Sequence, residues 1–569
     1  FYYKTFMWPK AFWERVYEPV IRASAGLGRL SGETDPDTYD KGFLHCDILI
    51  VGAGPAGLAA ALAAGRAGAR VILADEGFRF GGRLNAETHE IGGKMGGSWV
   101  QSVINELDTL GNVRLMLRTT IYGAYDHQIF GALERVTDHL PSNAGKPRQI
   151  LWRVYSKRSI LCAGATERSI GFGGNDRPGV MLAGAVRTYA NRFDVATGNK
   201  IAVFTNNDDG WRTAFDLAAK GIDITAVIDS RNCPAPAGPN GARVIMDGRI
   251  VKTRGRHGIR SITLSTGQTI QTDCLAVSGG WSPNIQLTCH ERGVPTWRED
   301  ISAFVPGKNV PKDMAITGAA NGALTLFSAL SEGLAAANIA VDDLGFTPTS
   351  TSLPQADDEP FAITPLWHVS ESSGRAWVDL QNDVTVKDIH LAHMEGFRSV
   401  EHLKRYTTLG MATDQGKTAN LLGLALMAEC SGKSIPETGT TIFRPPFTPV
   451  PIGAFAGRSR GSNFRPHRLT PSHKWAEECG AVFTEAGAWL RAQWFPRDDE
   501  THWRQSVDRE VMQTRRSVGV CDVSTLGKID IQGRDAAKLL NLVYANGFAK
   551  LVVGKVRYGL MLREDGIVM

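Results

Sequence analysis

Residues 47–76 read DILIVGAGPAGLAAALAAGRAGARVILADE, and this stretch decides the fold. Its opening apolar run, DILIV, has the length and composition of a buried β-strand. The alanine-rich run LAAALAAGRAG predicts a helix packed on a sheet, and RVILAD predicts the next strand. Three glycines with the spacing G-x-G-x-x-G stand between the first strand and the helix. This strand–turn–helix–strand context predicts a dinucleotide-binding unit.

Each residue of this turn has an expected role. Gly52 permits the tight turn, Gly54 lets the backbone approach a pyrophosphate, and Gly57 lets the helix pack closely on the strand. The start of the helix supplies free N–H groups and a partial positive charge for the anion. Asp75 ends the second predicted strand, where an acid can bind the ribose hydroxyls, and the adjacent Glu76 is a second candidate.

A second glycine pair follows in GFRFGGRL, residues 77–84. Gly81 and Gly82 can bring another backbone segment beside the phosphates, and Arg83 adds positive charge. This placement is typical of flavoproteins with two dinucleotide-binding domains, in which FAD usually occupies the first site.

Three later segments resemble the remaining parts of such a fold. Residues 159–181 resemble the crossover into a second unit, residues 273–284 the return, and residues 314–337 the last strand and a closing helix. In the last segment, the residues predicted to lie near the ligand are Gly318, Ala320, Gly322 and Leu324.

The second unit repeats the fold pattern without its glycines. Residues 199–230 read as strand, turn, helix and strand, but the turn is FTNNDDGW. The side chains of Asn206, Asn207 and Asp208 would crowd a pyrophosphate, and Asp208 and Asp209 would repel its charge. We therefore expect that this unit has lost NAD(P)H binding and that electrons arrive from elsewhere. An unusual turn that still binds phosphate is the alternative.

The composition is that of a globular protein and argues against nucleic-acid binding, a disulfide framework and a zinc site. With 569 residues, 43% hydrophobic content and a net charge of +5, the chain reads as an ordinary globular protein without a nucleic-acid footprint. Its 8 cysteines contain no C-x-x-C pair, which favours a reducing cytoplasm over a disulfide framework or a zinc site. The chain opens on Phe1 and stops in a hairpin-like stretch, so we expect it to be a fragment truncated at both ends.

Residues 378–429 read as short helices and resemble the small ferredoxin-like domain of opine-oxidase-type flavoproteins. Those chains hold an iron–sulfur cluster with cysteines, which such clusters require. Here the corresponding positions are Asp379, Gln381, Asp414 and Ala419, so no cluster and no metal are predicted. Asp414 is expected to cap the next helix.

A basic group lies in the same segment. Lys404, Arg405 and Lys417 come near Thr407 and Gln415 in the sequence. A helix N-terminus flanked by cations can bind a phosphate, here that of a flavin lying against a partner subunit. The alternative is a solvated basic face.

Residues 510–569 resemble the start of the glycine-cleavage T-protein fold, which binds tetrahydrofolate. The matching stretches are VGVCDVSTLGKIDIQGRDAAKLLN and GKVRYGLMLREDG. The order of these parts resembles the alpha subunit of heterotetrameric sarcosine oxidase. The most specific evidence is the fusion itself and the stretch DVTVKDIHLAHMEGFRSVEHLKRYTTLGMATDQGKTAN.

The resemblance implies a cofactor set and partners. NAD would fill the first site, FAD would sit on a beta subunit, and FMN would lie at the interface between alpha and beta. Tetrahydrofolate would capture the one-carbon unit, and gamma and delta subunits would complete the heterotetramer. The implied reaction is oxidative demethylation of sarcosine, with no amine-oxidising catalytic residue assigned to this chain. The full set of predicted cofactor-binding residues is Gly52, Gly54, Ala56, Gly57, Asp75, Glu76, Gly77, Gly82, Arg83, Ile121, Gly318, Ala320, Gly322 and Leu324 for the first site, and Arg405, Thr407, Gln415 and Lys417 for FMN.

The fold class predicted is α/β: a two-dinucleotide-binding-domain, flavoprotein-like Rossmann fold with a degenerate second unit, then a small helical ferredoxin-like domain and the start of an α+β T-protein fold. The predicted domains are 1–43 as a remnant of a preceding domain, 44–198 with 270–345 as the first dinucleotide-binding domain, 199–269 as the degenerate unit, 346–375 as a linker, 376–430 as the helical domain, 431–470 as a Pro/Gly-rich connector and 471–569 as an incomplete folate domain.

Two other readings stay open. The chain could be an opine or D-amino-acid oxidase-type subunit with FAD in the first site. It could also be a non-catalytic scaffold whose NAD is purely structural. Loss of stability without loss of turnover per folded complex, on mutation of Asp75, would indicate the scaffold.

Overall fold

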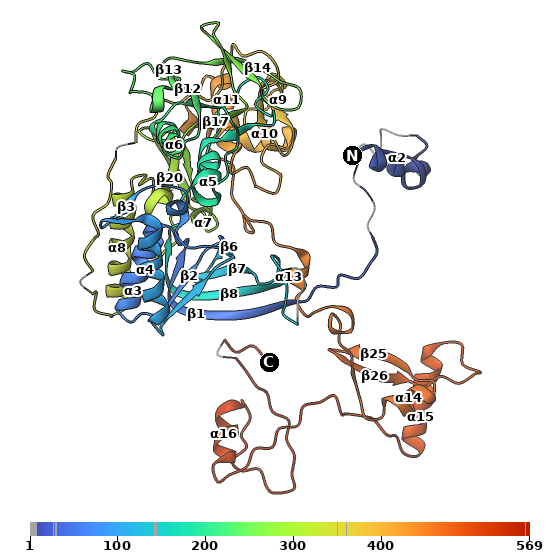
Figure 1. Cartoon of the computed structure of the whole chain (residues 1–569). Helices are drawn as coiled ribbons and strands as arrows, with labels where there is room; N and C mark the ends of the chain where they lie inside the picture. Colours follow the sequence, from blue (N-terminus) through green and yellow to red (C-terminus); the bar gives the residue numbers. More distant parts are fainter. Residues whose placement is uncertain are drawn as a thin grey trace. The chain divides into compact units, whose positions relative to one another are not determined.

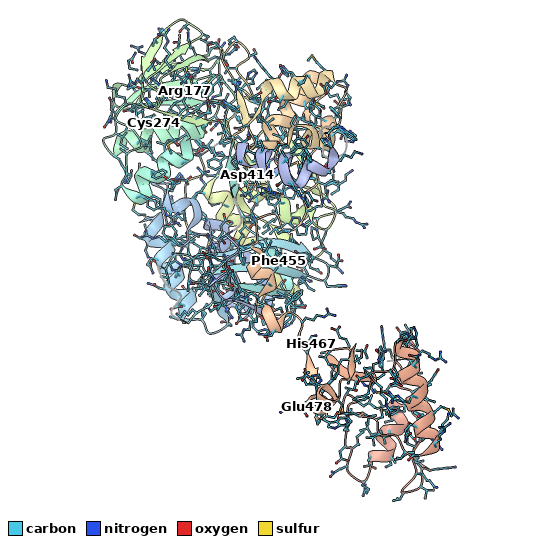
Figure 2. The ribbon with its side chains drawn as sticks, turned by 90° about the vertical axis from the view of Figure 1, so that its right-hand side faces the viewer. Arg177, Cys274, Asp414, Phe455, His467 and Glu478 are labelled. Carbon is cyan, nitrogen blue, oxygen red and sulfur yellow. The ribbon has the colours of Figure 1, made fainter. Side chains whose placement is uncertain are left out.

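The computed structural model describes residues 8–26, 28, 31–140, 145–349, 351–359, 361–563 and 565–568 (Figure 1). The chain divides into two compact parts, an N-terminal body, Phe1–Arg458, and a C-terminal body, Ser459–Met569. Both dinucleotide-binding units lie in the N-terminal body, where Figure 2 labels Arg177 and Cys274 in the region of a second sheet and Asp414 in the helical region. Near its start this body has the short helical segments η1 (Lys10–Phe12), η2 (Trp13–Tyr17) and α2 (Glu18–Ser24).

The first sheet has the order β5-β2-β1-β8-β7-β6, and β21 also pairs with β8. β5, β2, β1, β8 and β21 run parallel to one another, whereas β7 pairs antiparallel with both β8 and β6. The strands are β1 (Tyr39–Val51), β2 (Val71–Ala74), β5 (Val113–Met116), β6 (Thr119–Tyr125), β7 (Ile129–Arg135), β8 (Gln149–Leu161) and β21 (Met314–Ile316). The predicted boundary at residue 43 is therefore wrong, because β1 pairs with β8 from Tyr39 onward.

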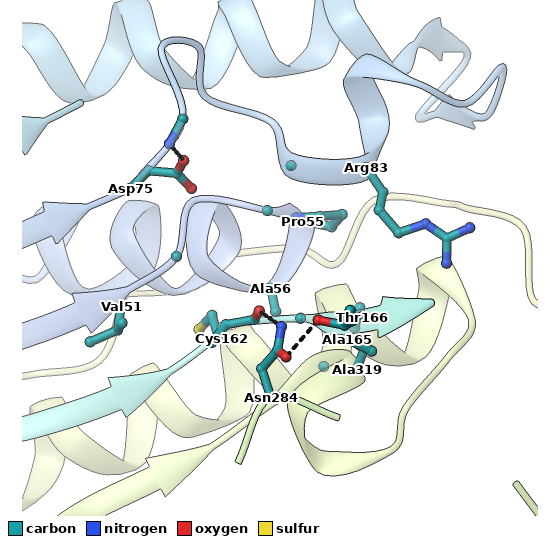
Figure 3. A pocket seen from close by; sticks show the side chains of 18 of the residues that line it. Val51, Pro55, Ala56, Asp75, Arg83, Cys162, Ala165, Thr166, Asn284 and Ala319 are labelled. Atoms are coloured by element: carbon teal, nitrogen blue, oxygen red, sulfur yellow. Dashed lines mark hydrogen bonds between the residues drawn. The ribbon is translucent and has the colours of Figure 1, made fainter. Parts of the chain in front are cut away.

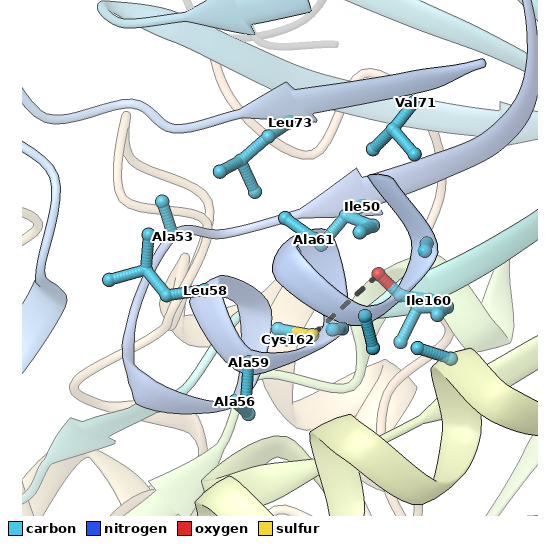
Figure 4. Close-up of a cluster of buried hydrophobic side chains, with 14 of the residues drawn as sticks. Ile50, Ala53, Ala56, Leu58, Ala59, Ala61, Val71, Leu73, Ile160 and Cys162 are labelled. Carbon is cyan, nitrogen blue, oxygen red and sulfur yellow. Dashed lines mark hydrogen bonds between the residues drawn. The ribbon is translucent and has the colours of Figure 1, made fainter. Parts of the chain in front are cut away.

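Helices α3 (Pro55–Arg66), α4 (Gly96–Thr109) and α8 (Leu326–Asp343) cover one face of this sheet (Figure 1). Alternation along β1 decides which face receives which side chain: Ile48 and Ile50 join the helical core, and Leu49 joins the opposite core. The helical core is rich in alanine, so the helices approach the sheet closely (Figure 4). The opposite core contains residues of β6, β7 and the short α7 (Gln286–Cys289).

The second sheet is parallel and has the order β10-β17-β11-β12-β13. α5 (Ala183–Phe193) and α6 (Asp208–Ala219) pack on one face, and the antiparallel strands β14–β16 pack on the other. The strands are β10 (Val180–Leu182), β11 (Ile201–Thr205), β12 (Ile224–Asp229), β13 (Arg243–Ile245), β14 (Ile250–Arg254), β15 (Ser261–Leu264), β16 (Thr269–Gln271) and β17 (Cys274–Ser278).

The structure moves the limits of the second unit outward. β10 and α5 were predicted within the first domain, which extended to residue 198, yet both pack with the second sheet. β17 was predicted with the return segment from residue 270, yet it is the strand between β10 and β11. Chain order alone does not show that β17 pairs with β10 on one side and β11 on the other, because these partners lie about seventy or more residues away from it.

The remaining elements around the two sheets are short. They are β3 (Glu90–Ile91), β4 (Lys94–Met95), β9 (Ala165–Glu167), β18 (Trp281–Pro283), β19 (Val294–Arg298), β20 (Ala303–Lys308) and the 3-10 turns η3 (Gly82–Asn85), η4 (Pro239–Gly241) and η5 (Gly318–Asn321). β9 and β18 pair antiparallel where the chain crosses between the two sheets in each direction.

The segment predicted as a linker packs against the cores of both sheets of the N-terminal body. We call residues 351–359 and 361–369 the strap. Leu366 and Val369 pack into the core of the second sheet, and Ala356 packs against the first core. An isolated bridge joins Ile363 to Asn207 in the turn of the second unit. The predicted linker is thus a bound element rather than a free connection.

The helical domain follows as β22 (Trp377–Asp379), β23 (Val384–Thr385), α9 (Val386–Met394), α10 (Val400–Thr407), α11 (Asn420–Ser431) and α12 (Ile435–Thr438). Thr385 and Asp388 form a capping box that starts α9. Ile389 and Leu403 are fully buried in the core of this domain. The connector then returns to the first sheet, where Ala454 of α13 (Ile452–Ala456) packs against Tyr39 and Leu151.

In its described residues, the C-terminal body contains a three-stranded sheet and three α-helices. Its elements are β24 (Arg468–Leu469), β25 (Val482–Ala486), β26 (Trp489–Trp494), α14 (His473–Glu478), α15 (Trp503–Arg516) and α16 (Ala536–Val543), after the turn η6 (Gly461–Asn463). Arg509 of α15 pairs with Glu500 and also donates to the carbonyl of Phe495, which fastens the helix to the end of β26.

Candidate dinucleotide site

A cavity of about 560 Å³ lies at the carboxyl ends of the parallel strands of the first sheet. Its wall is formed by the residues that follow β1, β2, β8 and β21, which are Gly52, Asp75, Cys162 and Thr317. Ligands of open α/β sheets bind at this edge, because the loops and helix N-termini that can hold them are gathered there. The cavity is thus in the place where a dinucleotide is expected.

The glycine turn has the geometry that its sequence predicts. Gly52 has a φ of +97°, and a Cβ on it would lie 2.4 Å from the carbonyl oxygen of Cys162. A Cβ on Gly57 would lie 1.9 Å from the carbonyl oxygen of Gly52. Both residues therefore serve close backbone packing. Pro55 occupies the first turn of α3, where its missing N–H costs no hydrogen bond.

Gly54, unlike Gly52 and Gly57, faces open space rather than packed backbone. A Cβ built on it meets no atom within 4 Å, and the residue lines the cavity. A Cβ on Gly82 would lie 2.9 Å from the Cα of Gly54, so the second glycine loop approaches the first. No side chain caps the start of α3. An open backbone cradle at a helix N-terminus fits a diphosphate group.

Asp75 is bound to the turn itself. Its carboxylate accepts hydrogen bonds from the N–H groups of Ala53 and Gly77, each at 2.7 Å. Figure 3 draws Asp75 with one hydrogen bond as a dashed line. Each carboxylate oxygen retains a lone pair that can accept a ribose hydroxyl. The adjacent Glu76 is exposed and lines the cavity, and among the described residues no group donates to its carboxylate. Asp75 therefore shapes the loop, and Glu76 has free acceptors for a ligand.

Arg83 departs from its expected role. It lines the cavity, but its guanidinium pairs with Glu87 and, at 3.0 Å, with Asp209 of the second unit. The same guanidinium lies 4.0 Å from the centroid of the Trp281 ring. In the view of Figure 3, Arg83 and Asp75 lie on opposite sides of Pro55. These carboxylates balance its charge, and a contribution of Arg83 to binding the phosphates stays a prediction.

The second turn is buried rather than open to repel an anion. The exposed fractions of Asn206, Asn207 and Asp209 are 1%, 0% and 2%. Asn207 caps α6 by accepting the N–H of Asp209, and its amide donates to the carbonyl of Ser278. Asp209 also pairs with Arg187 at 3.4 Å. These side chains replace the phosphate group with internal hydrogen bonds and ion pairs.

The strap closes the same turn from outside. The Ala362 N–H donates to the Asp208 carboxylate at 2.7 Å, and the Asp208 N–H donates back to the Ala362 carbonyl at 3.2 Å. The Thr364 N–H donates to the Asn206 carbonyl at 3.0 Å. Arg231 pairs with Asp208 and donates to the Ala362 carbonyl. The backbone of the strap therefore forms hydrogen bonds with the turn of the second unit. This turn is the counterpart of the glycine turn in the first unit.

Glu167 lies in β9, between the two sheets, and the pKa of its carboxyl group is strongly raised. It is buried, and one of its oxygens accepts the Gly184 N–H at 2.6 Å while the other has no partner among the described residues. Burial, followed by the charge of Asp209, raises the pKa of Glu167 to about 8. The carboxyl group is therefore protonated in the folded protein at neutral pH.

This pKa predicts a pH dependence of stability. Below the unfolded-state pKa of 4.5 both states carry the proton, and between there and about 8 only the folded state does. The free energy of unfolding should therefore fall as pH rises through this window. Glu167→Gln keeps an acceptor for Gly184 without titrating, so it should flatten this fall. Urea unfolding at about pH 5 and about pH 8 measures it, with the exposed Glu90→Gln as control. An unchanged fall in the Glu167 variant would refute the assignment.

The structure gathers most of the predicted first-site residues around the cavity. Those that line it are Gly52, Gly54, Ala56, Asp75, Glu76, Gly77, Gly82, Arg83, Ile121, Gly318 and Leu324. Gly57, Ala320 and Gly322 do not line it. Ala320 is fully buried, and a Cβ on Gly322 would lie 2.8 Å from the Arg298 guanidinium, so these positions serve packing.

Other cavity residues were missed because nothing local marks them as ligand contacts. Asn284 donates to the Ala163 carbonyl and accepts the hydroxyl of Thr166, each at 2.9 Å, which ties two crossover segments together beside the cavity (Figure 3). Arg192 reaches the cavity from α5, a helix of the second unit. The sequence does identify the two crossover segments. The polar residues within these segments, such as Thr166 and Asn284, were the one feature that could have indicated ligand contacts there.

Each predicted FMN residue contacts another residue of the chain. Lys417 lines the dinucleotide cavity, with its Nζ 4.9 Å from the centroid of the Phe447 ring. Arg405 pairs with Glu401 on the same helix, and the hydroxyl of Thr407 donates to the carbonyl of Leu403. Gln415 donates to its neighbour's backbone at the Ala412 carbonyl. An FMN site at these residues stays a prediction.

Hydrogen bonds join the loops that carry cluster ligands in opine-oxidase-type chains. Asp379 accepts the N–H groups of Gln381 and Gly410, and Gln381 accepts the hydroxyl of Thr413. Asp414 does not cap α11 as predicted: it accepts the Gly416 N–H within a turn, and α11 begins only at Asn420. Across the described residues, no group of three or more His, Cys, Asp or Glu side chains is arranged to hold a metal ion.

Comparison with known proteins agrees with this architecture. Residues 47–127 match the family model of FAD dependent oxidoreductases, 373–458 the sarcosine oxidase A3 domain, and 472–569 the GCVT N-terminal domain. The crystal structure of L-proline dehydrogenase from P. horikoshii superposes with a TM-score of 0.58 at 20% identity, over 75% of this chain and 82% of that chain. Fold and site thus define a protein of the FAD-dependent-oxidoreductase fold class with an appended T-protein-like segment.

Two curated relatives identify the family. The sarcosine oxidase subunit alpha of Rhizobium meliloti (strain 1021) is 48% identical, over 100% of this chain and 58% of its own length. That of Corynebacterium sp. (strain P-1) is 41% identical, over 95% of this chain and 58% of its own length. The chain belongs to the family of sarcosine oxidase alpha subunits, and it spans a little over half the length of these relatives. The predicted resemblance and fold class are confirmed.

Proposed function

We propose that this chain is part of the alpha subunit of a multimeric sarcosine oxidase. The complex would convert sarcosine, O2 and tetrahydrofolate to glycine, H2O2 and 5,10-methylenetetrahydrofolate. The observation that carries the proposal is the pairing of one open dinucleotide cradle with a second turn closed by the strap. This arrangement suits a subunit that holds a nucleotide and does not receive hydride from NAD(P)H.

We propose NAD for the first cavity. Gly54 and Gly82 would lie against its diphosphate, and Glu76 would accept hydrogen bonds from a ribose. The match of residues 47–127 to FAD dependent oxidoreductases favours the second candidate, FAD in the same cavity, as in the opine-oxidase-type reading. Both ligands share the adenosine diphosphate part, so the cradle by itself fits either.

The remaining cofactors and partners belong to the same proposal. FAD on a beta subunit and FMN at the alpha–beta interface would supply the two-electron oxidation of the amine and the reduction of oxygen. The T-protein-like segment, matched over 472–569, would present part of a tetrahydrofolate site. Holding folate near the product would raise the effective concentration at which the one-carbon unit is trapped. Gamma and delta subunits would complete the heterotetramer.

We also propose a cytoplasmic location. All 8 cysteines are free thiols, which suits a reducing compartment. No described helix combines the length and the apolar character needed to cross a bilayer.

Co-expression with the neighbouring open reading frames tests this function. We expect the purified complex to release NAD, FAD and FMN in equal amounts. Sarcosine should bleach the flavin absorbance, and NADPH should not, because the second turn is closed. FAD alone, released from this chain expressed by itself, would contradict NAD in the first cavity. Flavin bleaching by NADPH would contradict the closed second site.

A further inference from the structure

Arg192 connects the second unit with the first cavity. It lies in the last turn of α5, which packs on the second sheet, yet its side chain lines the dinucleotide cavity. The centre of its guanidinium is 4.3 Å from the centroid of the Phe78 ring, in the loop that follows β2. The ring covers one side of the guanidinium, and the N–H groups at its edge remain to be satisfied.

Two nitrogen atoms of the Arg192 guanidinium lack an acceptor among the described residues. The Nε and Nη2 atoms of Arg192 are closed to solvent and have no hydrogen-bond partner in the described part of the chain. No carboxylate there forms an ion pair with it either. Buried donors without acceptors are costly, and a guanidinium is the side chain best shaped to bind phosphate oxygens. The Arg192 guanidinium therefore needs a hydrogen-bond acceptor, and a ligand bound in the cavity can supply it.

A second cation points to the same ligand chemistry. Arg79 also lines the cavity, and its charge acts on Arg192. The pKa of Arg192 is lowered, first by burial and then by Arg79, while Asp75 acts in the opposite direction. Asp75 is already held by the N–H groups of Ala53 and Gly77. The carboxylate that acts on Arg192 is thus already occupied by the backbone, while a second arginine lies at the same cavity wall.

We propose that Arg192, assisted by Arg79, binds a phosphate group of the nucleotide in the first cavity. The inference rests on the proposed function, which places a nucleotide there. Charge-assisted hydrogen bonds from a guanidinium to phosphate are about twice as strong as neutral ones. The second unit, whose own turn is closed by the strap, would then complete the site of the first.

Two sources can supply this phosphate. One is the diphosphate bridge that every dinucleotide carries, and the other is the 2′-phosphate that distinguishes NADP from NAD. If Arg192 binds the bridge, NAD, NADP and FAD should all depend on it to the same degree. If it binds the 2′-phosphate, only NADP should lose affinity when Arg192 is removed.

Calorimetric titration of the whole chain with NAD, NADP and FAD tests the proposal. Arg192→Ala should weaken at least one of these ligands about tenfold or more. Arg79→Ala should have a smaller effect because this side chain is exposed. Arg192→Lys should recover part of the affinity. Arg118→Ala is the matched control, since Arg118 lies 5.5 Å from the centroid of the same Phe78 ring but does not line the cavity.

The outcomes separate the two proposals. If the parent chain binds none of the three nucleotides, both the proposed function and this inference fail. If the parent chain binds and Arg192→Ala binds equally well, only this inference fails. Equal losses of nucleotide affinity in the Arg192 and Arg118 variants would show that both arginines act by packing on Phe78. That result would also overturn the proposed phosphate contact of Arg192. Melting temperatures without nucleotide confirm that each variant is folded.

Discussion

Replacing Gly57 by alanine should destabilise the first unit severely. The new Cβ would lie 1.9 Å from the carbonyl oxygen of Gly52 and 3.0 Å from its carbonyl carbon. Both are backbone atoms of a buried turn, so neither can move aside cheaply. We expect a loss of about 3 kcal/mol or more in the free energy of unfolding, at the upper end of overpacking effects. Urea unfolding and the yield of soluble protein measure it.

Gly54→Ala is the matched control for that substitution. Its Cβ meets no protein atom within 4 Å, and its backbone is extended, with φ −74° and ψ −171°. Stability should therefore change by less than about 1 kcal/mol. Because the methyl group enters the cradle, NAD affinity should fall about tenfold. Equal stability of the Gly57 and Gly54 variants would contradict the different roles assigned to the two glycines.

The second large effect is expected at Asp75. Asp75→Ala removes the acceptor of two backbone N–H groups, those of Ala53 and Gly77. Leaving partly buried donors unpaired should cost about 2 to 4 kcal/mol in total. Glu76→Gln removes a charge that has no partner in the described part of the protein, so its stability should stay near the parent's. Its affinity for NAD should nevertheless fall, because Glu76 is free to accept ribose hydroxyls.

Thermal unfolding with and without NAD distinguishes these two effects. The Asp75 variant should melt lower under both conditions, and the Glu76 variant should lose only the upward shift caused by NAD. If Asp75→Ala kept the parent's stability without ligand, the loop-shaping role would be wrong. If turnover per folded complex were unchanged in the Asp75 variant, the scaffold reading would gain support over a direct role of the nucleotide in the reaction.

The closed second turn changes the physical account of lost nucleotide binding. Sequence reasoning attributed the loss to bulk and negative charge facing a pyrophosphate. In the structure, the charge of Asp209 is neutralised by Arg83 and Arg187, and Asp208 is bound to the strap and Arg231. Restoring glycines at this turn would therefore not reopen the site, because the backbone of the strap would still occupy its outer side.

The first unit was predictable because its determinants are local. The glycines at 52, 54 and 57 act within one turn, and the alternation in β1 assigns Ile48 and Leu49 to opposite faces. The limits of the second unit were not predictable in the same way. β10 and β17 are short and apolar, and only their pairing with each other and with β11 places them in the second sheet.

The amino-acid sequence by itself determined the dinucleotide fold, the loss of the second glycine turn, the absence of cysteines at the cluster positions and the family. Each of these is written in residue types at fixed short spacings. Tertiary structure alone decided that Arg83 faces Asp209, that the strap closes the second turn, and that Lys417 and Arg192 reach the first cavity. These contacts join residues more than a hundred positions apart, and such pairs are set by how sheets and helices pack rather than by any local pattern.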